Sequence, residues 1–218
     1  MKKVTILIPC FNEEGGLDIL YERLQDIICR LTHYEFQILL INDGSRDNTL
    51  AKMKALHAKD SKVSYLSLSR NFGKENAMLA GLDYAEGDAV IFMDADLQDP
   101  PELIPRMLKE WENGFDDVYA RRRSRAGETW LKKVTAHWYY RILQKFADID
   151  IPADVGDFRL LDRQAADALC SLREKQRYTK GLFSWIGYNK KEIVFDREPR
   201  VEGNSKMNFL KLLGLAID

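Results

Sequence analysis

The first 120 residues alternate short apolar runs with longer segments in which apolar residues recur at helical spacing. The apolar runs predict five strands, at residues 4–8, 36–41, 63–68, 89–93 and 118–120. The segments between them predict four helices, at residues 17–31, 47–58, 72–85 and 101–113, with Asp47 or Asn48 capping the second. This alternation predicts an α/β fold, with a mostly parallel sheet and helices on both faces.

After about residue 120 the alternation becomes less regular. A basic, aromatic-rich segment extends to about residue 147, and the pattern then predicts helices at 162–172 and 178–186 and a strand at 192–196. A length of 218 residues fits one domain. Within that domain we expect a core at 1–120, which carries the predicted sheet, and a second part at 121–218.

Composition and charge exclude several classes of protein. Lysine and arginine total 33 and aspartate and glutamate total 34, whereas a general nucleic-acid-binding protein carries a basic excess. Cys10, Cys29 and Cys170 are spaced too widely for a zinc site or a disulfide framework. No apolar run reaches the roughly 18 residues of a membrane-spanning helix. Hydrophobicity rises over residues 209–218 without a stop signal, which predicts that the sequence continues in a longer protein.

Acidic side chains follow three of the predicted strands. Glu13 follows the first, Asp43 the second, and Asp94 and Asp96 the fourth. Ligands of parallel α/β sheets bind beyond these carboxyl ends. Asp43 stands before a glycine, so an ordinary turn also explains it. The Asp94-x-Asp96 pair directly follows a buried run, where two like charges repel unless a cation lies between them. The sequence therefore predicts metal or phosphate chemistry at this edge.

Several metal and phosphate motifs do not fit. An EF-hand loop that starts at Asp94 would need glycine at position six and glutamate at position twelve, and those positions hold Asp99 and Pro105. The chain also has no Walker A, GxGxxG or HExxH motif. A phosphatase with an aspartyl nucleophile also places Asp-x-Asp after a strand and stays an alternative, although its nucleophile usually follows the first strand.

Four ordered motifs together resemble glycosyltransferase family 2, which has the Rossmann-like GT-A fold. They are IPCFNEE at 8–14, INDGSRD at 41–47, RNFGK at 70–74 and DADLQDPPE at 94–102. Two later segments, GDFRL at 156–160 and RVEGNSK at 200–206, are similar to the polyprenyl-phosphate glycosyltransferases of that family. The resemblance spans nearly the whole chain.

The resemblance implies a nucleotide-sugar site and an acceptor site. Around the donor it places Pro9, Phe11, Glu13, Asp43, Lys74, Asp94 and Ala95. It implies that Asp94, Asp96 and Gln98 hold Mg²⁺ or Mn²⁺, ions that prefer hard oxygen ligands. It assigns catalytic roles to Asp96 and Asp157, of which Asp157 orients the acceptor or acts as a base; a turn residue after Gly156 is the alternative. It places Arg122, Arg200, Ser205 and Lys206 at the acceptor phosphate.

The basic segment bears on the acceptor independently. Residues 121–145 contain eight lysines and arginines against one acid, Glu128, with tryptophans interleaved. This pattern is typical of an amphipathic helix in a membrane interface. A solvated helix whose aromatic residues face the core, or an RNA-binding patch, would have the same composition.

The resemblance and the basic segment together imply an inverting hexosyltransferase at the cytoplasmic face of a membrane. It would transfer a hexose from a nucleotide diphosphate, with UDP-glucose favoured, to polyprenyl phosphate. Open alternatives are a GDP-mannose enzyme similar to dolichol-phosphate mannose synthase, a polysaccharide-elongating transferase of the family, and a noncatalytic module that binds nucleotide sugar or lipid. Assembly into a homo-oligomer also stays open.

Overall fold

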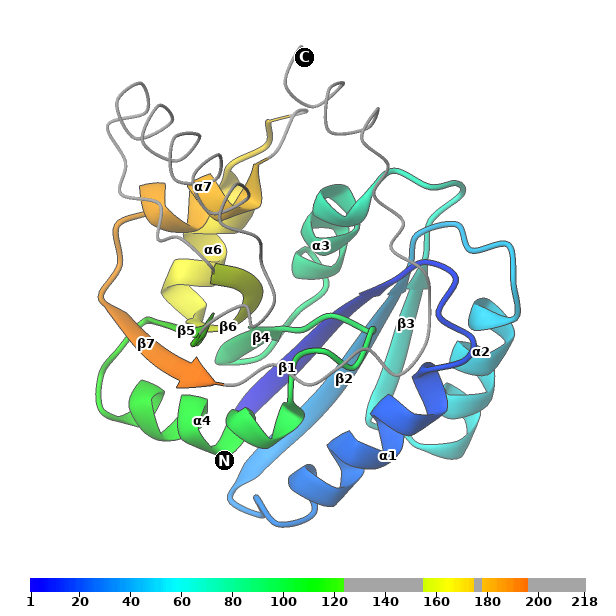
Figure 1. The fold of residues 1–218 in the computed structure, drawn as a ribbon, viewed down its shortest axis with the longest axis horizontal. Coiled ribbons are helices and arrows are strands. Elements are labelled where there is room, and N and C mark those ends of the chain that lie inside the picture. The colour runs from blue at the N-terminus through cyan, green and yellow to red at the C-terminus, as the bar shows by residue number, and fades with distance from the viewer. Residues whose placement is uncertain (124–154, 175–177, 196–218) are drawn as a thin grey trace.

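The computed structural model describes residues 1–123, 155–174 and 178–195. Its centre is a seven-stranded sheet in the order β3-β2-β1-β4-β6-β5-β7, in which only β6 runs antiparallel to its neighbours (Figure 1). The strands are β1 (Lys2–Cys10), β2 (Tyr34–Asn42), β3 (Val63–Ser67), β4 (Ala89–Phe92), β5 (Asp117–Arg122), β6 (Val155–Asp162) and β7 (Lys190–Phe195).

Helices cover both faces of this sheet, as the sequence predicted. They are α1 (Leu17–Ile28), α2 (Thr49–Lys59), α3 (Lys74–Leu82), the short 3₁₀ helix η1 (Pro101–Leu103), α4 (Ile104–Glu112), α6 (Arg163–Ser171) and α7 (Thr179–Trp185). Alternate residues of β1 face opposite cores: Ile6 and Ile8 pack in the cluster that includes α1, α2 and α4, whereas Leu7 packs with α3, α6 and α7. Both faces of the central strands are therefore apolar.

The sequence missed one strand. β6 lies between β4 and β5 and pairs with both, although its first half carries Gly156, Asp157 and Arg159. These polar positions hid the strand pattern, and the interpretation of Gly156 and Asp157 as a turn is wrong. The segment 121–146 lies mostly outside the described residues. No helix in the described part of the chain is long and apolar enough to cross a membrane.

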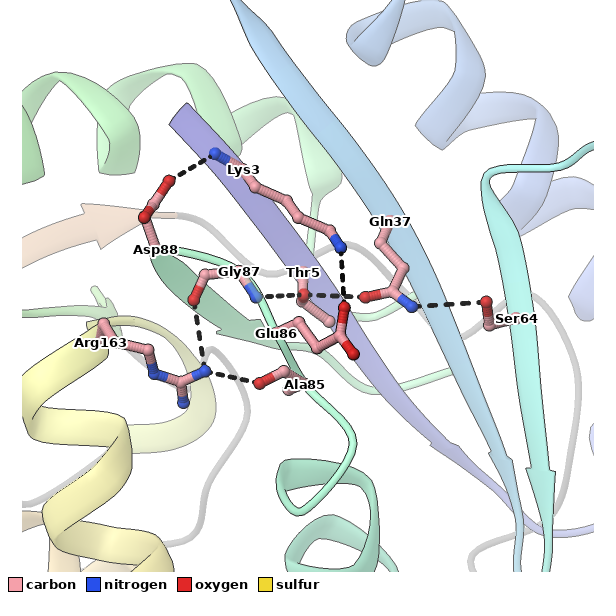
Figure 2. Close-up of polar contacts among 9 residues, drawn as sticks. All are labelled: Lys3, Thr5, Gln37, Ser64, Ala85, Glu86, Gly87, Asp88 and Arg163. Carbon is pink, nitrogen blue, oxygen red and sulfur yellow. Dashed lines mark hydrogen bonds and ion pairs between the residues drawn. The ribbon is translucent and has the colours of Figure 1, made fainter. Parts of the chain in front are cut away.

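Polar groups at the amino-terminal edge of the sheet hold the structure together (Figure 2). Thr5 Oγ1 in β1 accepts from the backbone of Gly87, 3.1 Å away, and donates to Gln37 in β2. Arg163, at the start of α6, donates to the carbonyl of Ala85 at 2.5 Å. The backbone N–H of Lys3 donates to Asp88. These bonds fix the connection into β4, so the neighbouring strands β1 and β4 are held in register at the end opposite to the predicted site.

Candidate functional site

The carboxyl ends of β1 and β2 are joined by hydrogen bonds between the loops that follow them. Asn12 stands in the left-handed region at φ 56°; its backbone N–H donates to Ser45 Oγ at 3.0 Å, and its side-chain oxygen accepts from the Arg46 backbone at 2.8 Å. The backbone N–H of Glu13 donates to Thr49 Oγ1. The predicted donor residues Pro9, Phe11 and Glu13 are therefore brought to one edge with their backbone fixed, and each is half-buried.

Asp43 is buried beneath the next loop, where its carboxylate organises residues 71–73. Its Oδ1 accepts from the backbone of Phe72 at 2.7 Å. Its Oδ2 accepts from the side chain of Asn71 at 2.9 Å and the backbone of Gly73 at 3.0 Å. A buried carboxylate with three donors is well compensated for its lost hydration. Asp43 therefore holds the segment that leads into α3, a role that the sequence did not reveal.

Gly44 is required by the same loop contact. Its φ is +65°, and a Cβ built on it would lie 2.4 Å from the carbonyl carbon of Arg70 and 2.5 Å from the nitrogen of Asn71. No side chain fits there without moving the backbone. The chain therefore bends at Gly44, and residues 70–73 pack directly against it.

Lys74, the first residue of α3, links the acidic residues of two strands. Its Nζ lies 2.5 Å from Asp94 Oδ1, just after β4, and 2.5 Å from Asp157 Oδ2, in β6. Burial lowers the pKa of Lys74, but the two carboxylates outweigh that effect and raise it above its ordinary value. The lysine is therefore a permanent cation at this position.

Of the two acids that contact Lys74, Asp157 is the more buried, with a side chain 10% exposed. Burial raises its pKa, but the ammonium of Lys74 and its hydrogen bond prevail, so the pKa lies below its ordinary value. Asp157 Oδ1 is buried and has no hydrogen-bond partner among the described residues. A carboxylate that stays ionised is a weak base, and its free oxygen can accept from a ligand.

The segment after β4 presents the second acid of the pair. Asp96 Oδ1 accepts from the backbone of Gln98 at 3.1 Å, and the buried Leu97 between them stands in the left-handed region at φ 62°. Ala95 and Leu97 are buried, whereas Asp94 and Asp96, on either side of Ala95, are partly exposed.

The donor set fits a hard divalent cation that also binds phosphate. In the described part of the chain, no three histidine, cysteine, aspartate or glutamate side chains converge to form a complete protein cage. Mg²⁺ usually takes one or two carboxylates and completes its shell with water and substrate phosphates. Asp94 and Asp96 supply two such carboxylates.

Two further charged residues belong to this edge, and only one was predicted. Asp99 is 2% exposed, and burial together with the negative charge of Asp94 raises its pKa to about 7, while Arg122 opposes the shift. Arg122, at the end of β5, lies beside Gly156, where a Cβ would come 3.6 Å from its guanidinium. Asp99 lies within the 94–102 motif, but nothing local in the sequence indicates that its side chain is buried.

Arg159, from the same sequence motif as Asp157, forms a structural ion pair. Its guanidinium donates to both oxygens of Asp117 at 3.3 and 3.0 Å and lies 3.6 Å from the ring centroid of Phe183. Both charged residues are buried. The pair locks β6 to β5 and to α7, which fixes the strand that carries Asp157. The predicted acceptor residues Arg200, Ser205 and Lys206 lie outside the described residues.

The family model for glycosyl transferase family 2 matches residues 5–170. The chain belongs to this family. Its relatives include an uncharacterized glycosyltransferase of Synechocystis sp., 46% identical over 99% of this chain and 68% of the relative. The bactoprenol glucosyl transferase of Shigella phage SfX is 42% identical over 99% of this chain and 70% of its own length. This family 2 chain therefore spans about two thirds of these relatives.

Solved structures confirm the GT-A fold. The glucosyl-3-phosphoglycerate synthase of Mycobacterium tuberculosis, solved with Mn²⁺, UDP and phosphoglyceric acid, superposes with a TM-score of 0.65 over 98% of this chain and 74% of its own, at 17% identity. The mannosyl-3-phosphoglycerate synthase of Rubrobacter xylanophilus also gives 0.65, over 99% and 70%, at 19% identity. At such identities the likeness establishes the fold of this glycosyltransferase family member and nothing finer.

Proposed function

We propose that this protein transfers glucose from UDP-glucose to polyprenyl phosphate at the cytoplasmic face of a membrane. The observation that carries the proposal is the convergence of Asp94 and Asp157 on Lys74 where β4 ends and β6 begins, with Asp96 two residues after Asp94. This is the edge at which a doubly wound sheet binds nucleotides, beside the neighbouring strands β1 and β4 where the strand order reverses. The bactoprenol glucosyl transferases among the relatives support glucose and a polyprenyl acceptor.

The residues suit an in-line displacement with inversion. An oxygen of the acceptor phosphate attacks the anomeric carbon, the bond from that carbon to the diphosphate oxygen breaks, and UDP leaves with the electron pair. Asp94 and Asp96, with Gln98 nearby, would hold a divalent ion, which would supply positive charge to stabilise the diphosphate as a leaving group. A phosphate monoester with a second pKa near about 6 is largely dianionic at neutral pH. It needs little help from a base, so the reaction does not require Asp157 to act as one.

The remaining predicted residues have roles in the same scheme. Pro9, Phe11 and Glu13 line the nucleoside side of the donor site, and Asp43 supports that side from beneath by holding residues 71–73. Arg122, Arg200, Ser205 and Lys206 bind the acceptor phosphate, for which arginine provides a bidentate contact and lysine a point charge. The basic segment 121–146 places the domain on the anionic membrane surface that holds the lipid.

Release of UDP in the presence of divalent metal tests the proposal. UDP-glucose, GDP-mannose and polyprenyl phosphate would be supplied in detergent micelles, with polyprenol as the control that lacks phosphate. UDP-glucose with polyprenyl phosphate should release UDP; polyprenol should not. Arg200→Ala and Lys206→Ala should raise the polyprenyl phosphate concentration that gives half the maximal rate. The UDP-glucose concentration that gives half the maximal rate should change much less. Transfer only to sugar hydroxyls, or a preference for GDP-mannose, would refute the acceptor or the donor assignment.

A further inference from the structure

The ammonium of Lys74 occupies a position that would suit a metal ion. It lies 2.5 Å from an oxygen of Asp94 and 2.5 Å from an oxygen of Asp157. Oxygen ligands surround divalent cations at roughly 2.0–2.6 Å. One predicted metal ligand, Asp94, therefore already has a cationic partner supplied by the chain itself.

The surroundings make this lysine a movable partner. The backbone before it is fixed, because Asp43 binds residues 71–73 and α3 begins at Lys74. The side chain is 37% exposed, so its long flexible stem has room to turn. Asp157, in contrast, is nine-tenths buried and keeps one oxygen without a partner among the described residues. Burial holds Asp157 in place, whereas the lysine stem can turn and carry the cation away.

We propose that Lys74 makes metal binding depend on the nucleotide. Without donor, its ammonium neutralises Asp94 and Asp157 and repels a divalent cation from Asp94, since like charges at short range oppose each other. A nucleoside diphosphate offers the ammonium another anionic partner and offers the metal further oxygen ligands. Metal and nucleotide then bind with positive coupling, and the free enzyme does not retain metal alone. This inference rests on the donor site of the proposed function.

Titration of Mn²⁺, followed by the loss of the free-ion electron paramagnetic resonance signal, tests the coupling. The wild-type chain should bind Mn²⁺ weakly alone and at least about tenfold more tightly with saturating UDP, within the usual range for coupled sites. Lys74→Met should bind Mn²⁺ alone about tenfold or more tighter than wild type, and the further gain on adding UDP should be smaller than in wild type. Lys180→Met is the matched control, because Lys180 acts on Asp157 only through its charge at a distance. It should behave as wild type.

A second variant, Lys74→Gln, and thermal melts distinguish the loss of the charge from a folding defect. The glutamine amide can still donate hydrogen bonds but carries no charge, so it should also bind Mn²⁺ more tightly. Mn²⁺ without UDP should raise the melting temperature of both Lys74 variants more than that of wild type, because a ligand stabilises the state that binds it.

The possible failures are distinguishable. If the wild type binds UDP with Mn²⁺ but both Lys74 variants bind Mn²⁺ alone no more tightly than wild type, the role of Lys74 is refuted and the donor site stands. Equal gains in Lys74→Met and Lys180→Met would also refute it, since any nearby charge would then suffice. If the wild type does not bind UDP with Mn²⁺ at all, the donor site fails and this inference fails with it.

Discussion

Individual acidic residues at the carboxyl edge of the sheet have different tasks although they look alike in sequence. The carboxylate of Asp43 accepts from the side chain of Asn71 and the backbone of residues 72 and 73, Asp94 and Asp157 share an ammonium, and Asp96 accepts a bond within a tight turn. The hydrogen-bond and ion-pair partners of each acid explain these differences. A buried carboxylate loses its hydration and must bind whichever donors lie within reach. Substitutions at this scale should therefore separate binding from folding.

Asp96→Asn should uncouple donor binding from metal. The substitution removes one charge while its side-chain oxygen can still accept from Gln98, so the fold should persist. Calorimetry should show UDP affinity that rises with Mn²⁺ in the wild type, falls when EDTA is added, and is insensitive to both in the variant. Asp88→Asn makes the same change at the opposite edge of the sheet, where the Asp88 carboxylate accepts from the Lys3 backbone. This variant should leave the metal effect intact. A normal metal effect in Asp96→Asn would exclude Asp96 as a ligand.

Gly44→Ala should destabilise the fold by about 1–3 kcal/mol more than Gly114→Ala, the usual cost of overpacking. Both glycines have positive φ, but the Cβ at Gly44 meets backbone at 2.4 Å, whereas nothing lies within 4 Å of the Cβ at Gly114. Both variants also place an L-residue at positive φ, so the comparison removes much of that shared strain and emphasises the clash. Urea unfolding of both variants provides the measurement. Equal losses would mean that the 70–73 segment moves away without cost.

Among the helices, the residues at the amino-terminal ends differ in how much they contribute to the stability of the fold. In α6, Asp162 accepts from the backbone of Gln164 at 3.0 Å, and its other oxygen accepts from the indole N–H of Trp111 in α4 at 2.8 Å. The N-cap residue of α2, Asn48, makes no such bond, and it is the neighbouring Asp47 that binds Thr49. One carboxylate thus joins two helices and the end of β6.

Asp162→Ala should cost about 2–4 kcal/mol of unfolding free energy. Loss of a cap costs about 1 kcal/mol, and a buried indole N–H left without an acceptor costs about 1–3 kcal/mol. Asn48→Ala should change stability by less than about 0.5 kcal/mol, as exposed positions do. Chemical denaturation compares the two. Similar small effects at both helices would show that water replaces Asp162 at Trp111.

At the scale of the whole molecule, the membrane interaction is the principal prediction. Residues 121–146 should bind anionic vesicles reversibly, with roughly 1 kcal/mol per basic residue near the surface. Binding should weaken as salt rises, because exposed charges are screened over about 8 Å at 0.15 M. Co-sedimentation across a salt series is the measurement. Lys132→Glu with Lys133→Glu should reduce binding, while Lys54→Glu with Lys62→Glu, outside this segment, should not. Equal binding to neutral vesicles would contradict the electrostatic part.

The layered α/β architecture can be read from the sequence alone, because short apolar runs such as 36–41 and amphipathic segments such as 17–31 each show a local hydrophobic pattern. The sequence also located Asp94 and Asp96, since an acid pair directly after a buried strand is a local signal. The strand β6 and the charged cluster around Lys74 depend on tertiary contacts. β6 became a strand only because β4 and β5 pair with both its edges, against its own polar composition. Lys74, Asp94 and Asp157 are up to 83 positions apart in sequence. Only the folded sheet brings an oxygen of each carboxylate to 2.5 Å from the Lys74 ammonium.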